Sequence, residues 1–165
     1  MKDYIGDAYS ILRTVTPLAG LDCGRLCGAR CCKGSDEDGM ELFHGEAERY
    51  RNDPSFTVRT DGERELLVCS GRCDRHSRPL SCRMYPLFPV PVEQDGKVQI
   101  RVVYDLRGYG SCPLIRERIR LNPRFVRAVH MAGLTLARDS RNLAMMRETA
   151  VLFEELASFT QTMTK

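Results

Sequence analysis

Apolar residues recur every three or four positions in two stretches of the first third of the chain, a spacing typical of one helix face. The first stretch covers residues 3–16 and ends at Pro17. Its apolar positions are Ile5, Ala8, Leu12 and Val15. The second covers residues 40–51 and stops at Asn52-Asp53-Pro54. We therefore expect two helices before residue 54.

The last third of the chain has the clearest helical pattern. Asn122-Pro123 is typical of a helix start, and a second helix is expected after Arg138-Asp139-Ser140. The two apolar stripes consist of Phe125, Val129, Ala132 and Leu136, and of Leu143, Met146, Ala150, Phe153 and Ala157. We expect these helices to pack antiparallel on each other and on a sheet; the alternative is that one stripe forms a dimerisation face.

Two hairpins are expected between these helical parts. Phe56–Arg59 and Glu65–Cys69 flank an Asp-Gly pair, which is a strong turn signal. Residues 87–92 and 97–104 flank a second Asp-Gly pair. Two prolines confine the first arm of the second hairpin to a sheet edge.

The pattern as a whole predicts a single α+β domain over residues 1–165, mainly helical, with one or two small hairpins around a cysteine-ligated metal centre. Residues 20–115 form the predicted metal-binding region, and residues 116–165 the C-terminal helical pair. Residues 21–38 and 70–86 lack periodicity, so we expect loops there with at most short helical turns.

Eight cysteines are the most informative feature of an otherwise ordinary globular composition with a net charge of +3. No stretch approaches the roughly 18 to 20 apolar residues of a membrane span, and acidic residues near the N-terminus do not suit a signal peptide. We therefore expect a cytoplasmic protein without a membrane partner. Because disulfides are rare in a reducing compartment, clustered cysteines there indicate metal thiolates. A secreted disulfide scaffold is the alternative.

The cysteines fall into two groups along the chain. Four lie within ten residues, and thiolates are soft donors with high affinity for zinc and for iron–sulfur iron. This first group is Cys23, Cys27, Cys31 and Cys32, and the second is Cys69, Cys73, Cys82 and Cys112. Adjacent cysteines point in different directions, so Cys31 and Cys32 are not expected to be equivalent ligands of one tetrahedral shell. Cys112 is expected at a helix start, as a true ligand.

The sequence resembles the YkgJ-like cysteine-cluster family, also called the CxxCxxCC family, whose members are described as zinc- or iron-chelating proteins. The resemblance covers roughly residues 20–115. It rests on Cys23, Cys27, Cys31-Cys32, Arg78-Pro79, Cys82-Arg83, Tyr85-Pro86 and Cys112. One departure is the gap of three residues between the first two cysteines, where the family name implies two.

The resemblance implies a cysteine-ligated zinc or iron centre, or an iron–sulfur cluster, without supplying a reaction. A flagellin lysine methylase is similar in its cysteine region, so an iron–sulfur-dependent enzyme or electron-transfer factor is one alternative to a zinc-stabilised binding module. A metal-handling chelator is another. Whether the protein is an enzyme stays open, because no phosphate-binding glycine motif follows a strand.

Other candidates have simpler interpretations. Arg78 and Arg83 flank Cys82 and would offset the charge of a metal–thiolate centre. His76 is an alternative ligand, three residues after Cys73. Tyr85-Pro86 is expected to be a packing and turn element. We expect His44 and His130 on helices, and Glu41 and Glu48 on a solvated face.

A basic stretch precedes and enters the first C-terminal helix. It consists of Arg116, Arg118, Arg120, Arg124 and Arg127. Nucleic-acid binding would require interleaved aromatic residues, of which only one is present, so a solvated helix face is the preferred interpretation. The metal ion is therefore the expected partner.

Overall fold

The computed structural model describes residues 2–32, 39–71 and 73–162, and for residues 160–162 the backbone alone. Its elements, in chain order, are α1 (Tyr4–Ile11), α2 (Gly24–Cys27), η1 (Arg30–Cys32), β1 (Met40–Glu41), η2 (Ala47–Arg49), β2 (Phe56–Asp61), β3 (Arg64–Cys69), η3 (Arg75–Ser77), α3 (Leu80–Met84), β4 (Leu87–Gln94), β5 (Lys97–Tyr104), η4 (Leu106–Gly108), α4 (Pro113–Arg116), α5 (Pro123–Leu136) and α6 (Ser140–Thr162). The helices and small antiparallel sheets confirm the predicted α+β class.

Both predicted hairpins are present. β2 pairs with β3 in the register Phe56↔Cys69, and β1 adds a third strand on the other edge of β3. β4 and β5 form a separate two-stranded sheet, in which each strand is an edge. The prolines of β4 therefore remove few ladder hydrogen bonds, as the sequence predicts.

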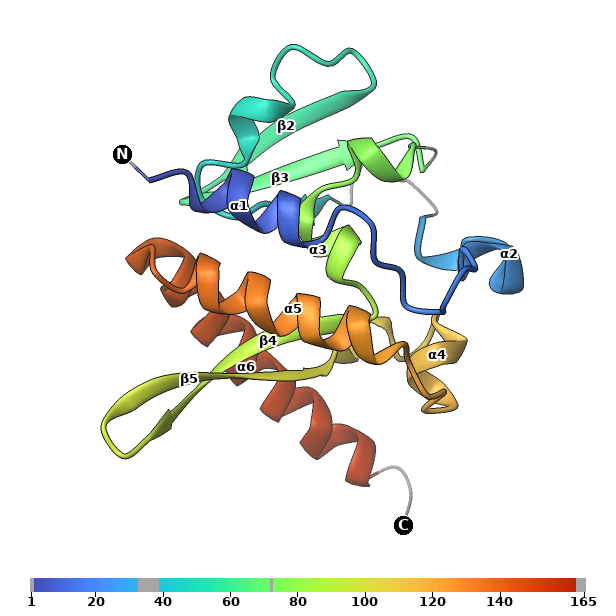
Figure 1. Cartoon of the computed structure of the whole chain (residues 1–165), viewed down its shortest axis with the longest axis vertical. Helices are drawn as coiled ribbons and strands as arrows, with labels where there is room; N and C mark the ends of the chain where they lie inside the picture. The colour runs from blue at the N-terminus through green and yellow to red at the C-terminus, as the bar shows by residue number, and fades with distance from the viewer. Residues whose placement is uncertain (1, 33–38, 72, 163–165) are drawn as a thin grey trace.

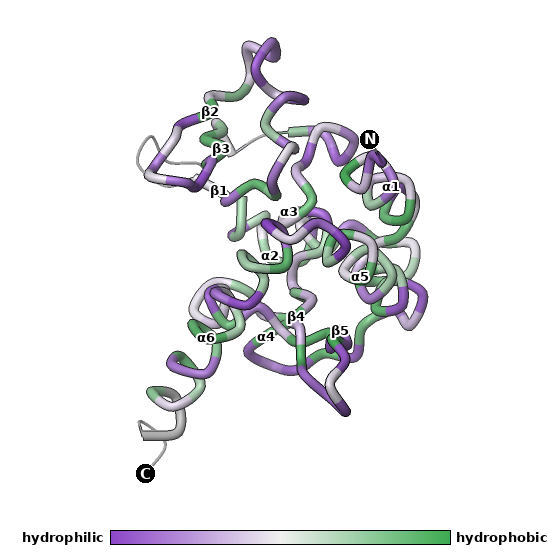
Figure 2. Tube along the Cα trace, turned by 90° about the vertical axis from the view of Figure 1, so that its left-hand side faces the viewer, coloured by the Kyte–Doolittle hydropathy of each residue, from purple (hydrophilic) through white to green (hydrophobic). Residues whose placement is uncertain are grey.

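Two layers of helix enclose the β4–β5 hairpin. α5 packs on one face of it and α6 on the other, with α1 lying outside α5 (Figure 1; Figure 2). Phe88 stacks against Phe43 and meets the Phe153 ring edge-on, so one strand residue joins the 43–50 turn to α6. Both C-terminal helices pack on this hairpin, as predicted, and they contact it more extensively than they contact each other.

The helix expected over residues 40–51 is not formed. Residues 40 and 41 belong to β1, and the rest forms a turn followed by the short 3-10 helix η2. Gly45 has a φ of +85°, which a continuous α-helix cannot include. The first helix is also shorter than residues 3–16 and ends at Ile11.

The loops around the cysteines contain short helical turns, as the sequence predicts for residues 21–38. Residues 70–86 include η3 and the five-residue helix α3, which carries Cys82. Residues 21–32 contain α2 and η1, while residues 33–38 of this predicted loop lie outside the described residues. Among the helices that the structure describes, none is long and apolar enough to cross a lipid bilayer.

Candidate metal centre

The eight cysteines come from four parts of the fold that lie around one end of α3. Cys23 precedes α2 and Cys27 ends it, while Cys31 and Cys32 belong to η1. Cys69 ends β3. Cys73 precedes η3, Cys82 lies in α3, and Cys112 is the residue before α4. All eight are free thiols.

Four of these thiols line one small cavity of about 70 Å³. We call them the α2 thiol set: Cys23, Cys27, Cys31 and Cys112. Burial raises the pKa of Cys23 to about 11, and the charges of Asp22, Cys27 and Cys112 add to this effect. Cys112 is the N-cap residue of α4, as predicted, and is 7% exposed. Its grouping is different from the one expected from chain order, because it joins the first cysteines and not Cys82.

The remaining thiols gather around Cys82, and we call them the α3 thiol set: Cys32, Cys69, Cys73 and Cys82. Burial raises the pKa of the Cys82 thiol, and the charges of the other three raise it further. Burial likewise raises the pKa of Cys73, with contributions from Cys69 and Cys32. Cys32, Cys69 and Cys73 therefore lie close enough to Cys82 to raise the pKa of its thiol.

The cysteine doublet is divided between the two sets. The sulfur atoms of Cys31 and Cys32 are 4.0 Å apart. A hydrogen bond from Cys31 lowers the pKa of Cys32 to about 6, with a further contribution from Arg78, although burial opposes the shift. The two thiols thus differ in environment and in ionisation.

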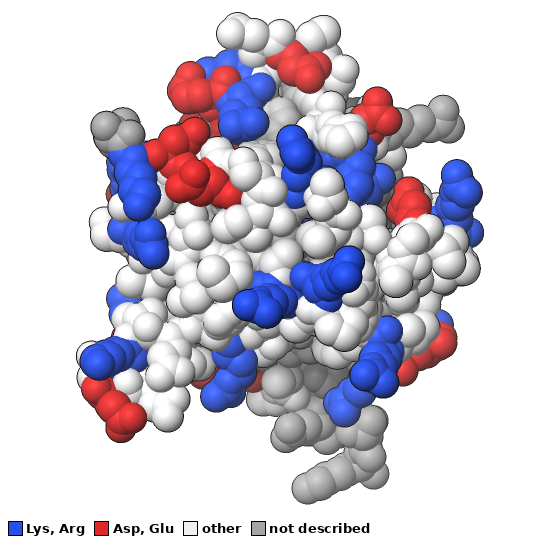
Figure 3. All heavy atoms as spheres, in the orientation of Figure 1, with Lys and Arg blue, Asp and Glu red and all other residues white. Residues whose placement is uncertain are grey.

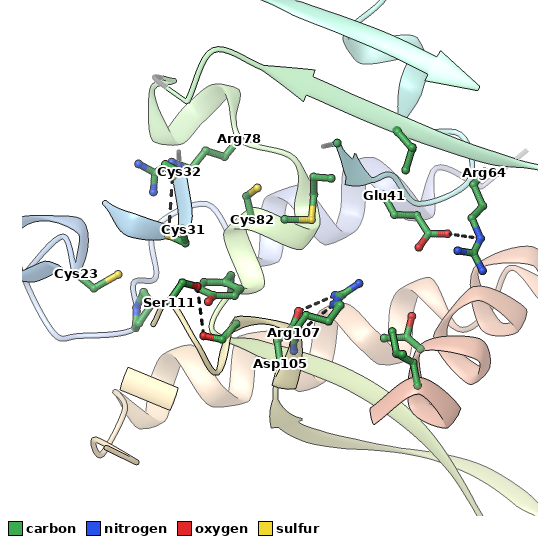
Figure 4. A pocket seen from close by; sticks show the side chains of 18 of the residues that line it. Cys23, Cys31, Cys32, Glu41, Arg64, Arg78, Cys82, Asp105, Arg107 and Ser111 are labelled. Carbon is green, nitrogen blue, oxygen red and sulfur yellow. Dashed lines mark hydrogen bonds and ion pairs between the residues drawn. The ribbon is translucent and has the colours of Figure 1, made fainter. Parts of the chain in front are cut away.

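A larger cavity of about 610 Å³ adjoins both sets. Cys23, Cys31, Cys32 and Cys82 lie on one side of it, and the Glu41–Arg64 ion pair lies on the opposite side (Figure 4). Between them, Arg107 and Asp105 form a short ion pair of 2.6 Å. The cavity therefore has a sulfur-rich wall and a charged wall.

The two arginines flanking Cys82 have different roles. Burial lowers the pKa of Arg78, but the nearby Cys32 and Cys73 thiols and Asp22 outweigh this and raise it overall. Arg78 thus faces the α3 thiol set, as predicted. Arg83 instead donates to the carbonyl oxygens of His76 and Arg78, at 2.6 and 2.9 Å, and its guanidinium lies over the Tyr9 ring. Arg83 therefore stabilises the backbone conformation of the segment before α3.

One buried polar atom without a hydrogen-bond partner lies beside each thiol set. Within the described residues these atoms are Arg78 Nε and Tyr85 Oη. Arg78 is next to the α3 thiol set, and Tyr85 next to Cys112 and Cys31 of the α2 thiol set. A buried donor without an acceptor costs about 1–3 kcal/mol. Thiolates bound to a metal are anionic acceptors, so these atoms and the soft donor sets fit a metal or cluster.

Gly108 allows Tyr85 to lie beneath the α2 thiol set. A Cβ atom at residue 108 would clash with Tyr85 Oη and lie 2.9 Å from Ile115 Cδ1. We expect Gly108→Ala to destabilise the fold by about 1–3 kcal/mol, because both neighbours are packed in the core. Gly110→Ala is the matched control, since no atom lies within 4 Å of its added Cβ. Urea unfolding of both variants tests this, and equal stabilities would contradict it.

The histidines do not join the thiol sets. His76 is exposed in η3, so its predicted role as an alternative ligand has no support in this arrangement. His130 lies on α5, as expected, whereas His44 lies in the 43–50 turn and its backbone N–H donates to Asn142 Oδ1 at 2.7 Å. Glu41 is half-buried beside Arg64, while Glu48 is exposed, as expected for a solvated face.

The sequence interpretation missed Glu46, which is the most buried acidic residue in the described part of the chain. Its side chain is fully buried and accepts hydrogen bonds from Tyr9 Oη and from the backbone N–H groups of Phe43 and Leu80. The sequence does contain an indication of this burial, because Glu46 lies among the apolar residues Phe43, Ala47 and Tyr50, which are spaced three or four positions apart. Glu46 holds α3, and therefore Cys82, against α1.

Within the described residues, no three His, Cys, Asp or Glu side chains converge closely enough to form a complete metal shell. The thiols are gathered in two sets without closing around a point. Comparisons with models of protein families, with curated proteins and with solved structures find no match to this chain. The resemblance to the YkgJ-like family accordingly stays a prediction.

Proposed function

We propose that this chain is a metal-binding protein with two centres, one held by the α2 thiol set and the other by the α3 thiol set. The observation that carries this proposal is the position of one unpartnered buried donor, Tyr85 Oη or Arg78 Nε, beside each set of four thiols. Four thiols per set match the coordination number of zinc and of iron in cysteine-ligated clusters.

Charge supports the same assignment. Four thiolates around a divalent ion carry a formal charge of −2, which requires compensation in a partly buried site. Arg75 and Arg78 line the sulfur-rich wall of the large cavity, and neither forms an ion pair with a carboxylate among the described residues. Burial and the charges of Arg78 and Arg83 lower the pKa of Arg75. Anionic metal–thiolate centres would relieve this repulsion.

The function depends on which metal the two centres bind. Structural zinc would fix loops that have little apolar content and would make the protein a zinc-stabilised binding module. An iron–sulfur centre would supply one-electron chemistry. The 610 Å³ cavity beside Cys31, Cys32 and Cys82 favours the second version, because a purely structural site needs no adjoining space for a ligand.

Metal and sulfide analysis of the untagged full chain tests the proposal. The protein is produced with iron and zinc in the medium and purified anaerobically without chelators. We expect two centres per chain, either as two zinc ions in a colourless protein or as iron with labile sulfide in a coloured one. Loss of the metal to a mild competing chelator would identify a metal-handling chelator. Eight thiols titrating freely in native protein without bound metal would overturn the proposal.

A further inference from the structure

The outer wall of the α2 thiol cavity is an exposed apolar pair. Leu26 of α2 and Ile119, which follows α4, are 65% and 36% exposed. Both also line the cavity of about 70 Å³ that contains Cys23, Cys27, Cys31 and Cys112. The same two side chains therefore cover part of this cavity, in which Cys31 is itself exposed.

Arginines surround this apolar pair. Arg25 adjoins Leu26 in α2, and Arg116, Arg118 and Arg120 are exposed around Ile119. Arg116 pairs with the neighbouring Glu117 at 3.1 Å, whereas Arg25, Arg118 and Arg120 form no ion pair within the described residues.

Some arginines elsewhere on the surface are neutralised, whereas others, such as Arg13, Arg59 and Arg101, also form no ion pair within the described residues. Arg51, Arg64, Arg141 and Arg147 each pair with a carboxylate. The basic character continues onto α5, where the centre of the face in Figure 3 carries basic side chains with no acidic one among them. The cations around Ile119 are thus available to an external anion.

The turn that presents Ile119 is strained and firmly held. Arg118 has a φ of +48°, in the left-handed region that side-chain-bearing residues seldom occupy. The Ile119 backbone N–H donates to Leu114 O at 3.1 Å, and Ile119 O accepts from Tyr104 Oη at 3.0 Å. Two hydrogen bonds therefore fix a local conformation that is costly by itself. A pre-organised surface loses less entropy on binding than a flexible one.

We propose that this face docks an acidic protein, and we call it the α2–α4 patch. Its members are Arg25, Leu26, Arg116, Arg118, Ile119 and Arg120. An apolar centre within a charged rim is typical of protein interfaces, in which arginine is enriched. Non-specific nucleic-acid sites rely instead on stacked aromatic side chains. The two apolar residues at the centre of this patch are aliphatic, and the tyrosines nearby, Tyr104 and Tyr109, line the neighbouring cavity with Arg118.

The position of the patch would bring a bound partner close to the α2 thiol set. A partner docked on Leu26 and Ile119 lies directly over the α2 thiol set. A complementary acidic surface would steer its approach and set its orientation. If that set holds a redox centre, the patch provides a short path to the partner; docking itself does not depend on the identity of the metal.

The test uses a dye-labelled plant-type ferredoxin, a small acidic protein, as the probe, with fluorescence anisotropy at 25 and 250 mM NaCl. The variant is the full metal-loaded chain with Arg116→Glu, Arg118→Glu and Arg120→Glu. Its matched control is Arg59→Glu, Lys97→Glu and Arg138→Glu, which changes the net charge equally on exposed residues elsewhere. Leu26→Gln tests the apolar centre without changing charge.

We expect wild-type affinity to fall about tenfold or more between the two salt concentrations, as for interfaces steered by charge. The patch variant should bind about tenfold more weakly than the control, and Leu26→Gln should weaken binding without changing its salt dependence. Equal losses in both triple variants, absence of binding at 25 mM NaCl, tighter binding of a 20-nucleotide single-stranded DNA, or self-association through the patch would overturn the proposal. Metal content is measured on each protein, so a failure of metal binding is recognised separately.

Discussion

Glu46→Ala is expected to lower the free energy of unfolding by about 3 kcal/mol or more, since it leaves two buried backbone N–H groups without an acceptor and removes the hydrogen bond from Tyr9. Glu46 Oε1 accepts from Tyr9 Oη at 2.5 Å and from Leu80 N at 2.7 Å, and Oε2 accepts from Phe43 N at 3.0 Å. These three donors come from α1, α3 and the 43–50 turn. One substitution therefore loosens three elements that are far apart in the sequence.

The surroundings of Glu46 compensate its charge without a direct ion pair. Because the Tyr9 hydroxyl donates to Glu46, the 2.6 Å contact between Tyr9 and Tyr50 is a hydrogen bond donated by Tyr50. The guanidinium groups of Arg49 and Arg83 lie 4.2 and 4.5 Å from the centre of the Tyr9 ring. The network thus spreads the negative charge over polarised hydroxyls next to two cations.

The contribution of Glu46 to stability depends on pH. Burial raises the pKa of its carboxyl group, although hydrogen bonds from Tyr9, Leu80 and Phe43 oppose the shift. Because the pKa of Glu46 is raised in the folded state, its contribution to stability is complete at pH values below its pKa in the unfolded chain, about 4.3. This contribution is lost as the pH rises through the pKa in the folded protein. Because glutamine does not titrate, the stability difference between wild type and Glu46→Gln should shrink from pH 5 to pH 8.

Urea unfolding of metal-loaded protein at both pH values measures these effects. Glu48→Gln is the control, because Glu48 is exposed and pairs only with the exposed Arg51. We expect the control to change stability by less than about 0.5 kcal/mol. A Glu46→Ala variant as stable as this control would show that the buried network contributes nothing.

Local turn chemistry explains which parts of the fold are predictable. Both hairpins follow from Asp-Gly pairs between alternating segments, and α5 follows from Asn122-Pro123 and a regular stripe. The helix expected over residues 40–51 fails at Gly45, whose left-handed backbone conformation interrupts it. α3 is too short for a periodic pattern to reveal. A helical stripe also does not say what it packs against, so the hairpin between α5 and α6 could not be foreseen.

The candidate site could also be predicted only in part: the sequence indicates which residues belong to it, but not how they are grouped in space. The cysteines could be selected from the sequence, because clustered thiols in this number are unusual. Their grouping could not, since neighbours in the chain need not be neighbours in space. Cys31 and Cys32 face different sets, and Cys112 reaches the α2 thiol set because α4 lies beside α2.

The division into two thiol sets predicts how metal is lost in single variants. Cys112→Ser should remove the centre of the α2 thiol set, and Cys82→Ser that of the α3 thiol set, because an incomplete set of four thiolates binds metal weakly. Each variant is expected to retain about half of the wild-type metal. The effect should be as large for Cys112 as for Cys82, although Cys112 is 30 residues further along the chain.

Double variants make the assignment sharper. Cys31→Ser combined with Cys112→Ser should retain one centre, since both residues serve the same set and the second loss adds nothing. Cys31→Ser combined with Cys32→Ser should retain none, even though these residues are adjacent. Metal content per chain, measured on proteins purified side by side under anaerobic conditions, distinguishes the two combinations.

Two results would contradict this assignment. Full occupancy in Cys112→Ser would make Cys112 a packed thiol that merely caps α4. Equal metal content in the two double variants would mean that the doublet serves a single centre. A serine preserves the size of cysteine but is a poor ligand for soft metals, so either result would reflect ligation and not a disturbed fold, provided that unfolding by urea is unchanged. The two double variants therefore decide whether the doublet is divided between two centres.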